Sequence, residues 1–155
     1  MLGEILARAY HGMVAELPLP NQIHALIPVP VSEERLQERG FNQAEQLASY
    51  LARSERLGLY DILRRTRHSD KQSLKTRGAR LRGTERLFEA DLRATAAMLG
   101  AVKADALSEI RLILIDDIYT TGSTANSCAQ TLTEAFKTLA PQMAVQLYAL
   151  TLARS

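Results

Sequence analysis

Two adjacent carboxylates followed by a turn of small hydroxyl residues form the stretch of this sequence best suited to chemistry. The carboxylates are Asp116 and Asp117, and Ile118 and Tyr119 separate them from the turn. The turn gathers hydroxyl side chains around one glycine: Thr120, Thr121, Gly122, Ser123 and Thr124. A glycine turn leading into a helix offers free backbone N–H groups and partial positive charge to an anion such as phosphate. The two carboxylates would repel that phosphate unless they hold ribose hydroxyls or a hydrated Mg²⁺.

The residues on either side of this stretch predict the elements that position it. An apolar run, residues 112–115, has the branched side chains typical of a buried strand and ends at the two carboxylates. After the turn, apolar residues recur at helical spacing: Ala125, Cys128, Leu132, Ala135, Phe136 and Leu139. Two other interpretations exist. An acidic pair at a strand end also occurs in phosphoacceptor receiver domains, and a hydroxyl-rich turn can serve only as a helix cap.

The segment IDDIYTTGST, residues 115–124, resembles the phosphoribosyl pyrophosphate (PRPP) signature of type I phosphoribosyltransferases. The resemblance implies that Asp116 and Asp117 are the catalytic pair, which holds the ribose hydroxyls and, indirectly, Mg²⁺. It also implies that residues 118–124 bind PRPP and that the turn wraps its 5-phosphate. Neither other interpretation explains the apolar run, both acids and the turn together.

A second candidate segment follows the first predicted strand, residues 23–31, whose sequence IHALIPVPV ends in prolines. Asn42 then begins a predicted helix as its cap. The combination of VPVP, a spacer with arginines and RGFNQAEQLA is similar to the ComF/GntX competence-type branch of the family. The resemblance implies a pyrophosphate-contacting loop with these members: Val29, Pro30, Val31, Arg35 and Arg39. On pattern alone, the prolines serve equally well as strand terminators.

The positive charge of the chain is concentrated in residues 64–86. This segment holds nine basic and two acidic residues, a formal charge of +7, whereas the rest of the chain sums to −5. It resembles the flexible region of ComF proteins, although Gly83 stands where asparagine is expected and Leu87 replaces a small residue. We expect a mobile lid over pyrophosphate, or a contact for single-stranded nucleic acid, with these residues: Arg64, Arg65, Arg67, Lys71, Gln72 and Arg80. A solvated basic loop is the plainer alternative.

The chain as a whole is predicted to be one α/β domain of 155 residues. Further predicted elements are a helix over residues 2–17, a strand over 61–66, helices broken by Gly100 within 88–110, and a closing strand over 143–152. The resemblance implies a type I phosphoribosyltransferase core, with a mainly parallel sheet of about five strands and a small hood. No apolar run reaches ~18 residues and no signal segment is present, so we expect a cytoplasmic protein without a membrane span.

Two functional hypotheses from different classes result. The first is a Mg²⁺-dependent phosphoribosyltransferase that releases pyrophosphate from PRPP; its acceptor base, and whether it forms a homodimer, stay open. The second is a non-catalytic, PRPP-responsive module that binds single-stranded DNA beside the competence machinery during natural transformation, as the ComF resemblance implies. Family members often carry an N-terminal Cys-rich zinc module. With one cysteine, Cys128, this sequence lacks it and is either a shortened member or part of a longer protein.

Overall fold

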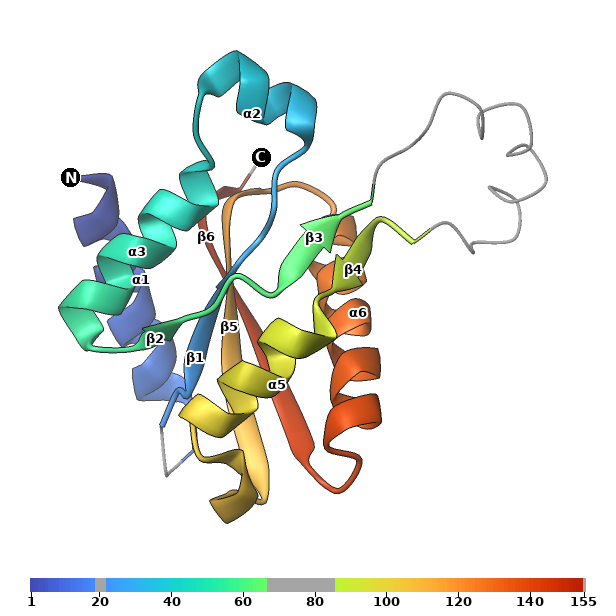
Figure 1. The fold of residues 1–155 in the computed structure, drawn as a ribbon. Coiled ribbons are helices and arrows are strands. Elements are labelled where there is room, and N and C mark those ends of the chain that lie inside the picture. The colour runs from blue at the N-terminus through green and yellow to red at the C-terminus, as the bar shows by residue number, and fades with distance from the viewer. Residues whose placement is uncertain (19–21, 67–85, 155) are drawn as a thin grey trace, which may run out of the picture.

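The chain folds around a parallel sheet with helices on both faces, as Figure 1 shows for a computed structural model. The structure describes residues 1–18, 22–66 and 86–154. The main sheet has the strand order β2-β1-β5-β6, formed by Gly58–Leu59, Ala25–Pro28, Glu109–Tyr119 and Ala144–Arg154. All its pairings are parallel. The α/β class and the parallel sheet are therefore confirmed, and the arrangement is consistent with a type I phosphoribosyltransferase core.

Strand β5 lies in the interior of this sheet and brings the acidic pair to one edge. Its residues Leu112–Ile115 are buried, as the apolar run predicted. Pro28 of β1 pairs with Ile115 of β5, and Asp116 of β5 pairs with Thr151 of β6. Because these strands are parallel, the exit of β1 and the acidic pair meet at the same carboxyl edge of the sheet, where ligands bind in α/β folds.

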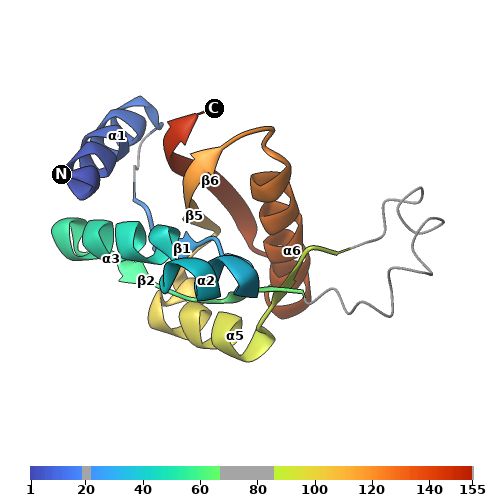
Figure 2. The same cartoon turned by 90° about the horizontal axis from the view of Figure 1, so that it is seen from above.

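The two faces of the sheet are covered by different helices (Figure 2). Helices α1 (Leu2–Glu16) and α3 (Gln43–Glu55) cover one face, and their apolar residues pack with Ile113 and Ile115. Helices α5 (Leu92–Ala101) and α6 (Ser123–Leu139) cover the other, where Leu112 and Leu114 point. This alternation follows from the two-residue period of a strand. No helix in the described part of the chain is long and apolar enough to cross a membrane.

The sheet differs from the expected one in the segment around residues 58–66. The main sheet has four strands within the described residues, not about five. The neighbour of β1 is the two-residue strand β2, whereas β3 (Leu63–Arg65) pairs antiparallel with β4 (Phe88–Ala90) in a separate sheet. The backbone N–H of Asp91 donates to the carbonyl of Ile62 at 2.8 Å and extends this small sheet. The strand predicted over residues 61–66 therefore exists, but outside the main sheet.

Two further stretches differ from their predictions. The spacer after β1 contains a helix, α2 (Glu33–Arg39), which Ser32 caps by accepting from the N–H of Arg35 at 3.3 Å. Gly40, with φ of +76°, ends this helix in the left-handed conformation that glycine favours. Within residues 88–110, Gly100 lies inside α5 rather than at a break. A 3-10 turn, η1 (Ala104–Ala106), separates α5 from β5.

Candidate functional site

A pocket of about 270 Å³ lies at the carboxyl edge of the sheet, between the ends of β1 and β5. Its lining comes from separate parts of the chain: Val29, Pro30, Val31, Ser32, Arg35, Arg65, Asp116, Asp117, Ile118, Thr120 and Thr124. Both carboxylates thus lie beside two arginines from other elements, α2 and β3. Opposite charges around one hollow suit a ligand that carries both phosphate and hydroxyl groups.

A larger hollow of about 890 Å³ lies between the start of α1, α2 and α3, and its lining includes Leu2, Phe41 and Tyr50. It contains neither carboxylate of the acidic pair and no residue of the 120–124 turn. Of these two hollows, the smaller is the candidate site, because charged residues from separate elements converge there, whereas Glu45 and Arg53 at the larger one both lie on α3.

The two carboxylates lie close to each other at the pocket, and each also has neighbours of its own. Asp116 lies near Cys128 of α6: burial raises the pKa of that thiol to about 12, and the charge of Asp116 adds to the shift. Burial, above all, raises the pKa of Asp116 itself to about 6, although the backbone N–H of Asp117 donates to its Oδ1 at 2.9 Å and opposes that shift. Asp117 lies toward α2, and Nη1 of Arg39 is 3.4 Å from its Oδ2. The pair therefore combines one partly desolvated carboxyl with one ion-paired carboxylate.

The turn after β5 has the conformation that its glycine suggests. Gly122 has φ of +78°, and α6 begins at the next residue, Ser123. The hydroxyl of Thr121 lies 3.0 Å from that of Ser123 and 3.4 Å from its backbone nitrogen. Thr120, Thr124 and Ile118 line the 270 Å³ pocket, whereas Tyr119, Thr121, Gly122 and Ser123 lie beside it. The turn thus presents hydroxyls and a helix N-terminus at the pocket rim, an arrangement that suits an anion.

The predicted pyrophosphate loop is divided by the structure. Val29, Pro30, Val31 and Arg35 line the pocket, but Arg39 contacts Asp117 instead of the hollow itself. The loop is anchored at its start, because the N–H of Val29 donates to the carbonyl of Ile115 at 2.9 Å.

Asn42 caps α3, as predicted, and also links this loop to that helix, which the sequence did not predict. Its Nδ2 donates to the carbonyl of Val29 at 3.2 Å, while its Oδ1 accepts from the N–H of Ala44 at 3.0 Å. An asparagine can do both because its amide carries a donor and an acceptor. That dual capacity was the only available signal in the sequence.

The predicted lid residues separate in the same way. Arg65 lines the pocket, and its guanidinium lies 5.6 Å from the ring centroid of Phe88. Arg64 instead pairs with Asp61 at 3.0 Å and approaches Asp91 at 4.0 Å. The remaining predicted lid residues, Arg67, Lys71, Gln72 and Arg80, lie outside the described residues. Of the lid arginines that the structure describes, Arg65 is the one that can reach a ligand in the pocket.

The acidic pair fits the predicted magnesium in its chemistry. Mg²⁺ is usually bound by one or two carboxylates, with water and substrate phosphates as its other ligands. Within the described residues, no group of three or more histidine, cysteine or carboxylate side chains could hold a metal ion on its own. Asp116 and Asp117 therefore suit an ion that arrives with a phosphorylated ligand better than a permanently bound one.

Comparisons with known proteins give similarity to competence proteins. The chain is 36% identical over 115 residues to "Competence protein ComFC" of Bacillus subtilis, across 74% of this chain and 40% of that protein. It is 32% identical to "Competence protein ComFC" of Streptococcus pneumoniae, across 84% of this chain and 51% of that protein. Identity to "Competence protein F" of Haemophilus influenzae is 33%, across 82% and 53%. The chain thus spans about half the length of these relatives, and no protein-family model matches it.

Proposed function

Because this chain belongs to the ComF family, we propose that it has a competence-linked function in which it binds PRPP and transfers the phosphoribosyl group. The acceptor is a nitrogenous compound, and the second product is pyrophosphate. One observation carries the proposal: the acidic pair, the β1 exit and two arginines from separate elements line a single pocket beside the 120–124 turn.

Each part of PRPP has a matching group at this pocket. The 120–124 turn and the N-terminus of α6 bind the 5-phosphate through N–H and hydroxyl donors. Asp116 and Asp117 accept hydrogen bonds from the ribose hydroxyls, and with phosphate oxygens they would hold Mg²⁺. Arg35 and Arg65 face the pyrophosphate, together with the backbone of residues 29–31. Bound Mg²⁺ would supply further neutralisation of the leaving group's negative charge.

The proposed reaction breaks the bond between the anomeric carbon and the pyrophosphate oxygen, and a nitrogen of the acceptor bonds to that carbon. The acceptor nitrogen loses its proton to water, and the electrons of the broken C–O bond leave with pyrophosphate. Positive charge develops on the ribose ring as the bond breaks, so the nearby carboxylates stabilise the transition state. Arg35 and Arg65 stabilise the departing negative charge. The protein's contribution is thus mainly positioning and electrostatics.

The test is a calorimetric titration of PRPP with Mg²⁺ present, comparing the wild type with the double variant Asp116→Asn/Asp117→Asn. The amide side chains keep the size of the carboxylates but remove both charges, so we expect the affinity to fall at least about 100-fold. Asp105→Asn removes an exposed carboxylate in η1 and serves as the control. Equal affinity in the double variant and the wild type would contradict the assignment. Pyrophosphate release in the presence of candidate acceptors then tests turnover.

Single-stranded DNA binding in the competence machinery is a second candidate, favoured by the +7 charge of residues 64–86. The structure adds one argument against base stacking there, because Phe88 is only 1% exposed and already lies under Arg65. Titration of an oligothymidylate, with and without PRPP, distinguishes the hypotheses. DNA binding without pyrophosphate release would favour the non-catalytic module, whereas release without DNA binding would favour the transferase.

A further inference from the structure

Tyr119 packs so closely against Gly122, the glycine of the 120–124 turn, that no other residue could take the glycine's place without a clash. A Cβ atom placed on Gly122 would lie 2.5 Å from the hydroxyl oxygen of Tyr119 and 3.0 Å from its Cζ. Gly122 is buried even though Thr121 and Ser123, its neighbours, are exposed. The ring of Tyr119 therefore occupies the space beneath the turn and supports its tightest point.

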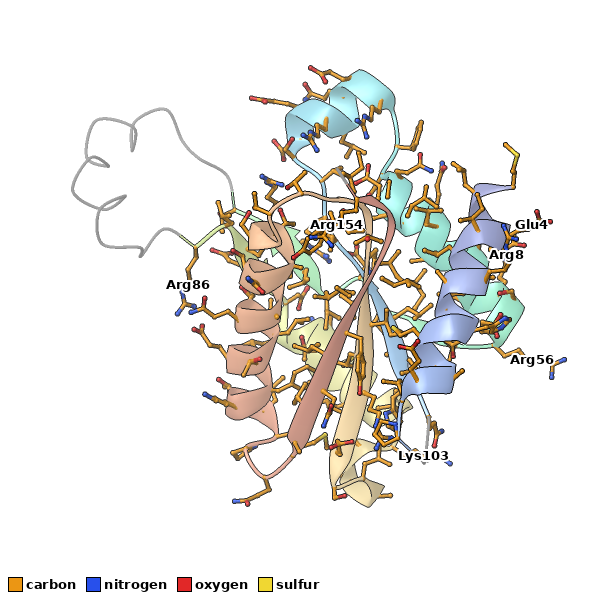
Figure 3. The ribbon with its side chains drawn as sticks, turned by 180° about the vertical axis from the view of Figure 1, so that it is seen from behind. Glu4, Arg8, Arg56, Arg86, Lys103 and Arg154 are labelled. Atoms are coloured by element: carbon orange, nitrogen blue, oxygen red, sulfur yellow. The ribbon has the colours of Figure 1, made fainter. Side chains whose placement is uncertain are left out.

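Arg154 lies over the same ring. Tyr119 and Arg154 are partners at the last pair of the parallel β5–β6 ladder, and the guanidinium carbon lies 5.7 Å from the ring centroid. Figure 3 shows Arg154 at the end of β6 that lies beside the turn into α6. A cation at this distance from an aromatic face is attracted to it. The β5–β6 pairing ends at this pair, so beyond it no backbone ladder holds the ring of Tyr119. The contact with Arg154 supplies that restraint instead.

We propose that Arg154, acting through Tyr119, is a positioning residue that holds the 120–124 turn in the shape that binds the 5-phosphate. This inference rests on the proposed function, adds Arg154 to its site and gives Tyr119 a supporting role there. Arg154 does not line the 270 Å³ pocket, so its effect reaches the ligand by way of the ring and Gly122. A turn with correctly placed donors needs no reorganisation when the phosphate arrives, and this lowers the free-energy cost of binding.

The restraint should act on one end of the ligand only. The residues that face the proposed pyrophosphate come from other parts of the chain: residues 29–31 follow β1, Arg35 lies on α2 and Arg65 lies on β3. The contacts of Tyr119 described above are with Gly122 and Arg154 instead. Ribose 5-phosphate and inorganic pyrophosphate therefore probe the two ends separately. A general loss of folding would weaken both ligands, whereas loss of the restraint should weaken ribose 5-phosphate alone.

The experiment is calorimetric titration of both ligands, with Mg²⁺, into the variants Arg154→Gln, Arg154→Lys, Tyr119→Leu and the double variant Arg154→Gln/Tyr119→Leu. We expect Arg154→Gln to weaken ribose 5-phosphate about three-fold, the size of an exposed cation–π contact, and Arg154→Lys to restore part of that affinity. Tyr119→Leu should weaken it about ten-fold, because the turn loses its support. Pyrophosphate affinity should stay unchanged in all of them. The control is Arg8→Gln, an exposed arginine on α1, remote from the turn in Figure 3.

The double variant decides the route of the effect. If Arg154 acts through the ring, removing it from Tyr119→Leu should weaken ribose 5-phosphate no further. A second full three-fold loss would mean that Arg154 attracts the phosphate directly and would overturn the proposal. Full wild-type affinity in both Arg154→Gln and Tyr119→Leu would also overturn it while leaving the proposed function intact. A wild type that binds neither PRPP nor ribose 5-phosphate would overturn the proposed function and this inference together.

Discussion

The two sides of the pocket are built by different means. Asp116 and Asp117 lie in β5, and the 120–124 turn joins this strand to α6, whose residues Leu132 and Phe136 pack in the core. The opposite side consists of residues 29–32 and α2, and no residue of α2 is buried. Polar contacts hold that side: the cap at Ser32, the Arg39–Asp117 pair and the two hydrogen bonds of Asn42. The first side is fixed mainly by burial, whereas α2 on the second side is held by a few hydrogen bonds and one ion pair.

This difference predicts that single polar substitutions disturb the α2 side most. Asn42→Ala removes both the α3 cap and the bond to Val29, so we expect the free energy of unfolding to fall by about 2 kcal/mol. Asn42→Asp keeps the acceptor for the N–H of Ala44 but loses the donor to Val29, and should cost about 1 kcal/mol. Urea denaturation measures both. If the aspartate variant is as stable as the wild type, the link to the β1 exit contributes nothing.

The same difference explains which parts of the fold could be predicted. The apolar run of β5 and the helical spacing in α6 reflect burial, and burial leaves a periodic pattern in the sequence. Helix α2 leaves no such pattern because none of its side chains is buried. Strand β2 is only two residues long, too short to show a period.

The candidate site was predictable to the same extent. The acidic pair and the turn come from one continuous stretch, so their proximity follows from the sequence. The contact between Arg39 and Asp117 joins residues 78 positions apart, and that pairing depends on the register of the whole sheet. Likewise, the sequence does not show that Arg65 lines the pocket while Arg64 pairs with Asp61; this follows from where β3 lies beside β4 in the fold. Adjacent arginines look alike in sequence, but alternation sends them to different places.

Arg64 and Arg65 therefore form a matched pair that tests the proposed pyrophosphate end. We expect Arg65→Gln to weaken pyrophosphate binding about ten-fold, since a charge-assisted contact is lost. Arg64→Gln should leave the affinity unchanged, because its partners are Asp61 and Asp91. The loss in Arg65→Gln should shrink at high salt, which screens the attraction. Equal losses in both variants would indicate general attraction by the basic segment rather than a contact in the pocket.

On the buried side, Asp116 should make stability depend on pH. Burial raises its pKa to about 6 in the folded protein, above the value of about 3.9 in an unfolded chain. Its stabilising contribution is therefore full below about pH 4 and is lost as the pH rises through about 6. Asp116→Asn avoids burial of the charge. We expect a gain of about 1 kcal/mol at pH 8, discounted because the carboxyl is partly exposed, and a smaller gain at pH 5. Urea denaturation at both values tests this, and an equal gain at each pH would contradict it.

The smallest expected effect belongs to the contact that joins the two sides. Arg39→Gln removes the 3.4 Å ion pair with Asp117, whose side chains are 45% and 18% exposed, so we expect a loss of stability of at most about 0.5 kcal/mol. Its effect on binding should have the opposite sign. Asp117 is released from the arginine and is free to accept hydrogen bonds from the ribose hydroxyls, so ribose 5-phosphate should bind slightly tighter.

PRPP itself tests whether Arg39 has a second role, because Arg39 lies on the same helix as Arg35, which faces the proposed pyrophosphate. If Arg39→Gln weakens PRPP but not ribose 5-phosphate, Arg39 leaves Asp117 to contact pyrophosphate, as the resemblance implied. If both ligands bind more tightly, Arg39 competes with the ligand for Asp117, and α2 is held in place at the expense of affinity.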